Sequence, residues 1–593
     1  MCYAQDDRKQ MNTPFGNVQH AVLNSHERQL VNFHGPTPVN SLLTPNDNQI
    51  LKTMNKSLHA SLFTLLLALS ACNRVSIPSD FTQSDSLPKI YPDYVDVTIP
   101  VNIAPLTFMM DTPADAMVAR YSVLAGSPSE GSSSLLAGSP SELLCSDTEG
   151  PSMDDWHQLL AAAQGNDLQV EVYAQRGGKW TRYQPFTIHV SPDSIDPYIS
   201  YRLISPSFVA YEVLTINQRC LENYDESVIY DNTLCSENSQ GQCINCHNYQ
   251  QYNPERMQFH ARQKDGGTVI AYDGTLKRVN MRNDSILSAG VYPAWHPWLP
   301  FIVYSTDKTT QSFHTTDPNK IEVYDSESDL ITYNVATDEV CNLENDTTEY
   351  EVFPCWAPDG KTLYYCSAHL DRQDSTISKE VETLRRIQEL KYNIYRKSFN
   401  PDTYEFGPRE LVFDAAAVDK SALWPRISPD GRFLLFTMTH FGYFPIWHHD
   451  ADLWMLDLTA APVLADSASE DAAPSDSSIV NSKLSNGKLR DLVELNSPDT
   501  ESYHSWSSNG RWVIFSSRRD DGTFTRPFIA HIDKEGSATR PFELPMSRPD
   551  AHRLSMKSYN VPEFMRGPVT INPQTFADLL KHDPVNVKYA GHK

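Results

Sequence analysis

The chain has 593 residues and carries 49 Lys and Arg against 74 Asp and Glu, a formal charge of −25. Hydrophobic residues make up 40% of it, which excludes wholesale disorder, and the length suits two to four domains or one large repeat domain with an accessory. The acidic balance argues against nucleic-acid binding, which needs a basic stripe.

The first recognisable segment is an export signal that starts at Met54. Lys56 precedes an apolar run, residues 58–69, that is too short to span a bilayer comfortably. The following Leu69-Ser70-Ala71-Cys72 resembles the lipobox of bacterial lipoproteins, in which the Cys is lipidated and becomes the first mature residue. The resemblance implies a mis-assigned leader (1–53), a signal peptide (54–71), a tether (72–90) and a lipid anchor on Cys72. A short buried helix ending at a Cys is the alternative.

Residues 91–195 are predicted to form a small β-rich domain. Between 168 and 190, apolar and polar residues alternate with period 2 on both sides of Gly177-Gly178, which predicts a hairpin that turns at these glycines. A Ser/Gly/Pro-rich heptapeptide occurs at 124–130 and again at 136–142, and we interpret the copy as an expanded loop.

A repeat begins near residue 285. Four segments align without gaps, and their first residues are Trp295, Trp356, Ile427 and Trp506. Three of them contain Pro-Asp-Gly or Ser-Asn-Gly, which predicts a tight turn, and the residues after it favour a buried strand. A second strand-like run follows each segment, so one repeat contains the four strands of a propeller blade.

This pattern resembles the Pro-Asp-Gly repeats of TolB-like β-propeller proteins over about residues 285–545. The resemblance is most specific at Asp359-Gly360 and Asp430-Gly431. It implies a mainly β fold, a propeller of about five to seven blades. We assign 285–550 to the repeats, 196–284 to divergent blades that carry an insert, and 551–593 to a C-terminal tail.

The motif C-x-x-C-H, formed by Cys243, Cys246 and His247, predicts one covalently attached haem c. Two cysteines three residues apart can form thioethers with the two vinyl groups of one porphyrin, and the adjacent His247 then serves as the proximal iron ligand. An export signal upstream fits this chemistry. A Cys243–Cys246 disulfide, a zinc site that includes Cys235 or His260, and an accidental match are the alternatives.

The sixth iron position has two candidate ligands, Met257 and His260, which follow His247 by ten and thirteen residues. Only about residues 225–265 separate strand-rich flanks, so we predict a haem-binding insert in the propeller instead of a complete cytochrome domain. An open sixth position and a packing role for either residue are the alternatives.

A further pattern lies thirteen residues after the first position of each repeat, where a cationic or titratable residue recurs. Because equivalent positions on successive blades lie around one face, these residues could form a ring that holds an anion, a carboxylate-bearing partner or haem propionates. Pairing with a neighbouring blade is the simpler alternative. The ring residues are Lys308, His369, His440 and Arg519.

Together these features predict a lipid-anchored envelope protein, facing the periplasm of a Gram-negative bacterium, that carries one haem and acts in electron transfer or redox sensing. The expected partner is a redox or envelope protein. The alternatives are a non-enzymatic propeller scaffold for envelope proteins and an accessory factor in cytochrome c assembly. No catalytic residue is predicted, and whether the protein is an enzyme is left open.

Overall fold

The computed structural model describes residues 75–124, 141–146, 150–206, 211, 213–235, 242–263, 265–459 and 489–593. The predicted signal segment and Cys72 lie outside these ranges. The described residues from Ile77 onward belong to one compact, mainly β unit. Across the described residues, no helix is both long enough and apolar enough to cross a membrane.

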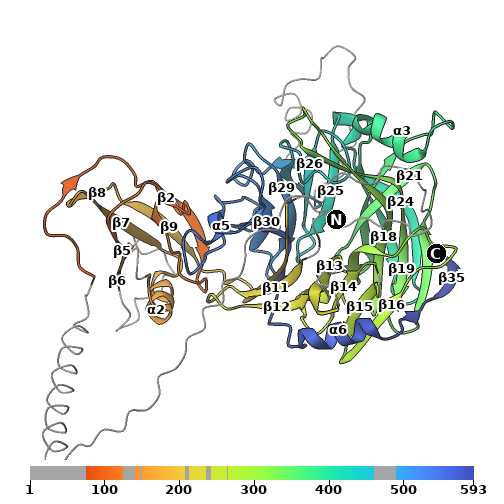
Figure 1. Ribbon diagram of the computed structural model, residues 1–593, viewed down its shortest axis with the longest axis horizontal. Helices are drawn as coiled ribbons and strands as arrows, with labels where there is room; N and C mark the ends of the chain where they lie inside the picture. The colour runs from red at the N-terminus through yellow and green to blue at the C-terminus, as the bar shows by residue number, and fades with distance from the viewer. Residues whose placement is uncertain are drawn as a thin grey trace, which may run out of the picture. The chain divides into compact units, whose positions relative to one another are not determined.

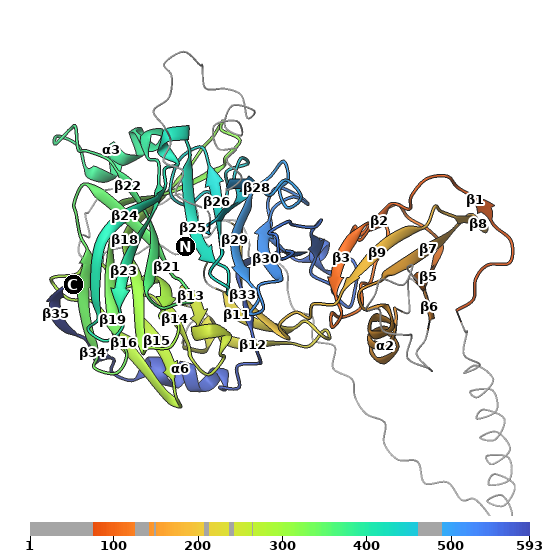
Figure 2. The ribbon, with the colours of Figure 1, turned by 180° about the vertical axis from the view of Figure 1, so that it is seen from behind.

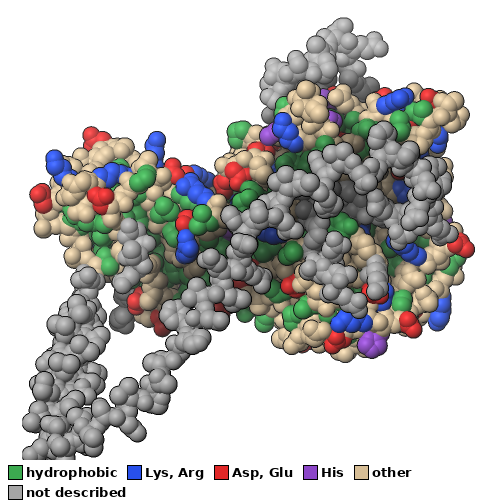
Figure 3. Space-filling view, viewed as in Figure 1, with side chains coloured by type: hydrophobic (Ala, Val, Ile, Leu, Met, Phe, Trp, Pro, Cys, Tyr) green, Lys and Arg blue, Asp and Glu red, His purple; other side chains and the backbone are tan. Residues whose placement is uncertain are grey.

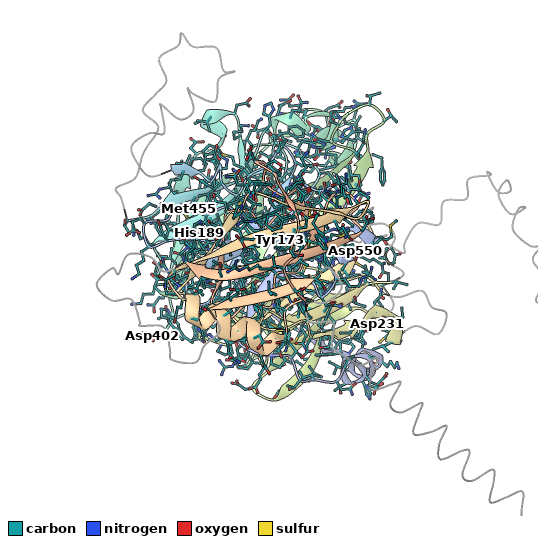
Figure 4. All side chains as sticks on the ribbon, turned by 90° about the vertical axis from the view of Figure 1, so that its left-hand side faces the viewer. Tyr173, His189, Asp231, Asp402, Met455 and Asp550 are labelled. Carbon is teal, nitrogen blue, oxygen red and sulfur yellow. The ribbon has the colours of Figure 1, made fainter. Side chains whose placement is uncertain are left out.

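The N-terminal part of this unit is built on one mixed sheet. Figure 4 labels Tyr173 and His189 on two of its strands. The predicted hairpin is present, and its two glycines, Gly177 and Gly178, have φ of 56° and 76°. The sheet comprises β1 (Thr82–Gln83), β3 (Val97–Pro100), β5 (Ala116–Leu124), β6 (Glu142–Ser146), β7 (Asp167–Arg176), β8 (Lys179–Arg182) and β9 (Phe186–Ser191). A separate pair is formed by β2 (Ile90–Tyr91) and β4 (Met109–Met110).

One helix packs on this sheet, α2 (Met153–Ala163), which begins after the capping residue Ser152. Its apolar face buries Trp156 in a core that also contains Trp512 and Ile514 of a later sheet. The two parts therefore share apolar packing. The remaining helices are short: α3 (Lys379–Arg385), α5 (Ala551–Leu554), α6 (Pro573–Lys581) and the 3₁₀ turns η1 (Asn232–Cys235), η2 (Gln250–Tyr252), η3 (Ile387–Glu389) and η4 (Ala416–Val418).

The remaining sheets consist of four-stranded antiparallel units, of which the two that start at β17 and β21 join into one larger sheet. In spatial order the units are β33 (Ser558–Met565), β10 (Tyr198–Ile204), β11 (Thr215–Cys220), β12 (Glu226–Asp231); β13 (Ile244–Tyr249), β14 (Met257–Ala261), β15 (Gly267–Tyr272), β16 (Thr275–Asn280); β17 (Val291–Trp295), β18 (Phe301–Phe313), β19 (Ile321–Asn334), β20 (Glu339–Glu344); β21 (Glu349–Trp356), β22 (Thr362–His369), β23 (Asn393–Asn400), β24 (Glu405–Phe413); β25 (Ser421–Ile427), β26 (Phe433–Thr439), β27 (Asp452–Asp457), β28 (Leu489–Asp491); and β29 (Glu501–Trp506), β30 (Trp512–Ser517), β31 (Arg526–His531), β32 (Phe542–Glu543).

These units are arranged as the blades of a propeller (Figures 1 and 2). The first strand of each unit contacts the first strand of the next: β13 contacts β17, and the contacts continue through β21, β25 and β29 to β33. Strand β33 contacts β13 again, so the series of innermost strands is closed. The predicted mainly β, propeller-type fold is confirmed at this level.

The repeat turns have the predicted chemistry. Gly360, Gly431 and Gly510 have φ between 59° and 75°, a conformation that glycine adopts without steric cost. The side chains of Asp359 and Asp430 accept hydrogen bonds from the N–H groups two residues later, at 2.9 and 3.1 Å. Each turn leads into the second strand of its unit, which is almost entirely buried, so the repeat motif encodes the first hairpin of a blade.

The C-terminal segment, assigned from the sequence to a tail, contributes three strands to the sheets. Strand β33 pairs with β10 and is thus the innermost strand of the first unit. Helix α6 lies beside β15 and β16 (Figure 1), while β34 (Val585–Asn586) pairs with β16 and β35 (Lys588–His592) with β20. The end of the chain therefore closes the series that residues 198–204 begin.

This closure makes a testable prediction. Met565 on β33 is completely buried, so Met565→Ala should lower the free energy of unfolding by about 2–5 kcal/mol. Val585→Ala on β34, where the side chain is 39% exposed, should change it by less than about 0.5 kcal/mol. Urea unfolding of both variants is the measurement, and similar losses in the two would contradict the role given to β33.

Candidate functional site

Each innermost strand contains one β-bulge, at the same position in every unit. The pairing register with the second strand shifts there, and one residue adopts a positive φ between 35° and 58°. Bulky residues rarely tolerate this conformation, and bulges commonly re-aim a side chain. We call the following set the bulge ring: Cys246, Tyr292, Phe353, Trp424, Tyr503 and Val561.

The bulge ring is largely aromatic, and neighbouring rings are in contact in T-shaped, tilted and stacked arrangements. The ring centroids of Tyr292 and Phe353 are 4.7 Å apart, those of Phe353 and Trp424 are 5.5 Å apart, and those of Trp424 and Tyr503 are 4.9 Å apart. Cys246 adjoins Tyr292 in the ring, and the backbone N–H of Tyr292 donates a hydrogen bond to the Cys246 sulfur at 3.5 Å. The bulges therefore present adjoining side chains from successive sheets.

The loop between β26 and β27 covers this ring. Its Tyr443 stacks on Phe353 with centroids 5.4 Å apart, and Phe444 contacts Trp424 and Tyr503 at 5.4 and 5.7 Å. Phe444 is buried. The loop thus packs onto several bulge-ring residues and covers them from one side.

Two adjoining cavities follow the innermost strands. The first, about 40 Å³, is lined by every bulge-ring residue and has room for a few water molecules. The second, about 330 Å³, is lined by the residues three positions later on each strand, and the two share Arg426 and Glu563. Because the innermost strands close on themselves, the cavities form one central channel. The second set is Tyr249, Trp295, Trp356, Ile427, Trp506 and Phe564.

Polar groups interrupt the aromatic wall. Glu563 accepts a hydrogen bond from the Asn248 amide at 3.2 Å and lies 3.8 Å from the Arg426 guanidinium; burial raises the pKa of Glu563. Among the described residues, the buried Asn245 Oδ1 and Trp424 Nε1 atoms, both from residues that line the first cavity, have no hydrogen-bond partner. Buried polar groups are normally paired, so these atoms are available to a ligand.

The C-x-x-C-H segment is part of this channel wall. Cys246 occupies the bulge and its thiol faces Tyr292 on β17, whereas the nearest backbone groups to the His247 imidazole are those of Ser200 and Val561, on the opposite neighbouring sheet. Neither nitrogen of His247 reaches a partner in hydrogen-bonding geometry within the described residues. Burial lowers the pKa of His247 to about 3, so its imidazole is neutral.

These positions do not fit covalent haem. Both thiols and the imidazole would have to meet one porphyrin, but Cys246 and His247 face different neighbours. Cys243 is completely buried, is disulfide-bonded, and accepts a backbone hydrogen bond from Arg262. Among the described residues no cluster of three His, Cys, Asp or Glu side chains could hold a metal ion.

The two candidate distal ligands lie on β14, beside the motif strand. Met257 is completely buried in the apolar core, and His260, three residues later, projects from the other face of the strand. The ring nitrogen Nδ1 of His260 bonds Thr268 Oγ1 at 3.1 Å, and burial lowers the pKa of His260 to about 3. Within the range of the predicted insert, the described residues 226–231, 244–249 and 257–261 form strands of two sheets.

Lys308 of the predicted cationic ring lies within β18, and its other three members lie at or just after the ends of β22, β26 and β30; each of the four has an acidic partner. On the face seen in Figure 3, basic and acidic side chains likewise intermingle. The pairs lie within single sheets or their adjoining loops, which reduces the charge left for an external anion. They are Lys308–Glu327 at 2.8 Å, His369–Glu349 at 3.0 Å, His440–Asp419 at 2.9 Å and Arg519–Glu501 at 3.0 Å.

Comparisons with known proteins identify no family. Neither family models nor curated proteins match the sequence. Among solved structures, one from a study of two prolyl endopeptidases aligns with a TM-score of 0.31 and 10% identity, over 59% of this chain and 42% of that one. An oligogalacturonate lyase from Vibrio parahaemolyticus aligns with TM-score 0.27 and 13% identity, over 55% and 85%. A puromycin-hydrolyzing peptidase from Mycobacterium tuberculosis aligns with a TM-score of 0.29 and 11% identity, over 78% of this chain and 57% of that one. The chain thus spans less than half of the first of these, and such low scores carry no functional argument.

The buried channel histidine makes a pH prediction. His247 binds a proton with a pKa of about 3 when folded and about 6.5 when unfolded, so the unfolded chain binds more protons between these values. The free energy of unfolding should therefore fall as pH decreases below about 6.5, by on the order of 1 kcal/mol per pH unit for this residue. Urea unfolding at pH 7, 6 and 5 should give a shallower pH dependence for His247→Gln, and an unchanged dependence would contradict the assignment.

Proposed function

We propose that this protein is a non-enzymatic, six-bladed propeller that binds a peptide segment of a partner protein in its central channel. The observation that carries the proposal is the bulge ring, which directs one side chain from every innermost strand into a common cavity. Six blades is the count that the closed series of innermost strands supports. A positive φ at a non-glycine residue costs free energy, and such strained residues cluster at functional sites.

A peptide suits this wall better than a uniformly apolar ligand. Aromatic side chains such as Phe353 and Trp424 offer stacking area, while the unpaired Asn245 Oδ1 and Trp424 Nε1 offer an acceptor and a donor. A peptide backbone presents donors and acceptors along its whole length, and an extended one fits a narrow channel. The second cavity, about 330 Å³, is within the size range of ligand pockets, whereas the first has room for only a small group.

The location proposed for this binding is the cell envelope. The lipobox-like sequence before Cys72 supports a lipid anchor, and the Pro-Asp-Gly turns support a TolB-like propeller. A lipid anchor would hold the channel near a membrane surface, so we propose an envelope protein as the source of the peptide.

Electron transfer through a covalent haem is the competing proposal, and the sequence motif is what favours it. It requires Cys243, Cys246 and His247 to leave the sheet positions described above. That rearrangement would remove Cys246 from the bulge ring and break the strand pairing of Ile244 and Asn245 with β14. An accessory role in cytochrome c assembly would require the same change.

Selection from a phage-displayed heptapeptide library on the immobilised protein tests channel binding. The enriched peptides should bind at least about tenfold more weakly to Trp424→Ala, because a buried aromatic anchor typically dominates such binding. Trp298→Ala is the matched control, since its side chain is 49% exposed and does not line the channel.

A second channel variant, Tyr503→Ala, protects the test against misfolding of the first, and melting curves establish that each variant is folded. Failure to enrich any peptide, or equal binding to the folded channel variants and the wild type, would contradict the proposal.

A further inference from the structure

Strands β18 and β19 form a long hairpin (Figure 1) with oxygen-bearing side chains on one of its faces. Asp307 on β18 lies opposite Ser328 on β19, and Thr309 lies opposite Asp325. Opposite residues project from the same face of a sheet, and so do residues two apart on one strand, such as Asp307 and Thr309. We call these four residues the oxygen cluster.

A bulge on β19 brings the cluster together. Between the two cross-strand pairs, β18 has one residue and β19 has two, so the pairing register shifts there. In a regular strand Asp325 and Ser328, which are three residues apart, would point to opposite faces. The additional residue turns both side chains to the face of Asp307, and bulges re-aim side chains in this way next to functional sites.

Three oxygens of the cluster are buried without a hydrogen-bond partner among the described residues. They are Oδ1 of Asp307, Oδ2 of Asp325 and Oγ of Ser328. Asp325 is 0% exposed and Ser328 is 1% exposed. The other two carboxylate oxygens accept from hydroxyl groups, Asp325 from Thr309 at 2.6 Å and Asp307 from Tyr443 at 3.5 Å. Buried polar groups are normally paired, so three unpaired oxygens on one face indicate a ligand.

The two carboxylates of the cluster have no cationic partner, unlike a neighbour on the same strand. Glu322 pairs with His448, with Oε2 2.9 Å from Nε2. Among the described residues, no Lys, Arg or His forms an ion pair with Asp307 or Asp325. The guanidinium of Arg262 lowers the pKa of both carboxyl groups from a greater distance, yet burial leaves both pKa values raised. Two buried carboxylates this close need a neutralising ligand.

We propose that the oxygen cluster binds a hard divalent cation, Ca²⁺, between Asp307 and Asp325. Ca²⁺ accepts about six to eight oxygen ligands in irregular arrangements, and a site made only of oxygens suits it better than zinc. The cluster holds two carboxylates and is thus smaller than the groups of three acidic, Cys or His ligands that the described residues lack. Hydroxyl, carbonyl and water oxygens would complete the shell, and two carboxylates suggest an affinity of about 0.1–1 mM.

A cation here would also fix the loop between β26 and β27 over the bulge ring. Tyr443 of this loop stacks on Phe353, and its hydroxyl donates to Asp307 and lies 3.2 Å from the hydroxyl of Tyr292. Repulsion between unneutralised Asp307 and Asp325 should loosen this support, and a bound cation should restore it. The proposal goes beyond channel binding and does not depend on what the channel binds.

The first test measures melting temperatures at pH 7.5. In about 10 mM CaCl₂ the wild type should melt about 1–3 °C higher than in EDTA with NaCl at equal ionic strength, because only the folded cluster binds the ion. Asp325→Asn and Asp307→Asn, which each remove one carboxylate, should show no such rise. In EDTA, Asp325→Asn should melt no lower than the wild type, because one of two like charges is gone.

Glu351→Gln is the matched control. Glu351 is 1% exposed and its Oε2 is also buried without a partner among the described residues, but it lies on β21, outside the oxygen cluster. This variant should keep the full rise in CaCl₂. The proposal is overturned if Ca²⁺ stabilises the wild type no more than NaCl does, as it would if bound protons neutralise the pair. It is also overturned if both Asp variants keep the rise, or if Glu351→Gln loses it as they do.

The second test uses the wild type as well as the variants and measures hydrogen–deuterium exchange by mass spectrometry. Ca²⁺ should slow amide exchange in the loop residues 440–451 of the wild type by about threefold or more relative to NaCl, because the cation stabilises the contact of Tyr443 with the hairpin. The same loop in Asp325→Asn should not respond to Ca²⁺. Equal exchange of the wild-type loop with and without Ca²⁺ would overturn the link between the cation and this loop.

Discussion

The bulge on each innermost strand is the constraint on which the rest of the site depends. It forces a non-glycine residue into positive φ, shifts the pairing register, and brings one side chain per sheet to the channel. Repetition around the closed series converts a local distortion into a ring. The aromatic contacts from Tyr292 to Tyr503, the cover supplied by Phe444 and the position of Cys246 all follow from it.

This arrangement gives the C-x-x-C-H motif a structural meaning. Cys246 occupies the bulge position of β13, as Tyr292 does on β17. Three residues later, Tyr249 on β13 corresponds to Trp295 on β17. The histidine after the cysteine corresponds to Pro293 and Pro354 of the next sheets. In this conformation, Cys246 and His247 are wall residues of a channel, and their facing directions follow the bulge.

Several features could be predicted from the sequence because they are local. The Pro-Asp-Gly turns and the hairpin at Gly177-Gly178 depend on residues adjacent in the chain. The joining of β33 to β10 could not be derived in this way, because its partner lies more than 350 residues away. The acidic partners of His369 and Arg519 lie on other strands. The sequence therefore showed the recurring cationic residues but not the carboxylates that pair with them. The bulge ring did leave a signal: four of its six residues precede a repeat's first position by three, and Pro follows four of the six.

The most direct test of this account is a reduced pyridine haemochrome spectrum of folded protein, produced from residue 72 onward behind an export signal in a host that attaches c-type haem. We expect no covalent haem band, because Cys246 and His247 are held on β13 facing different neighbours. A c-type α-band that survives acid–acetone extraction, at one haem per chain, would contradict it and make electron transfer the function to pursue.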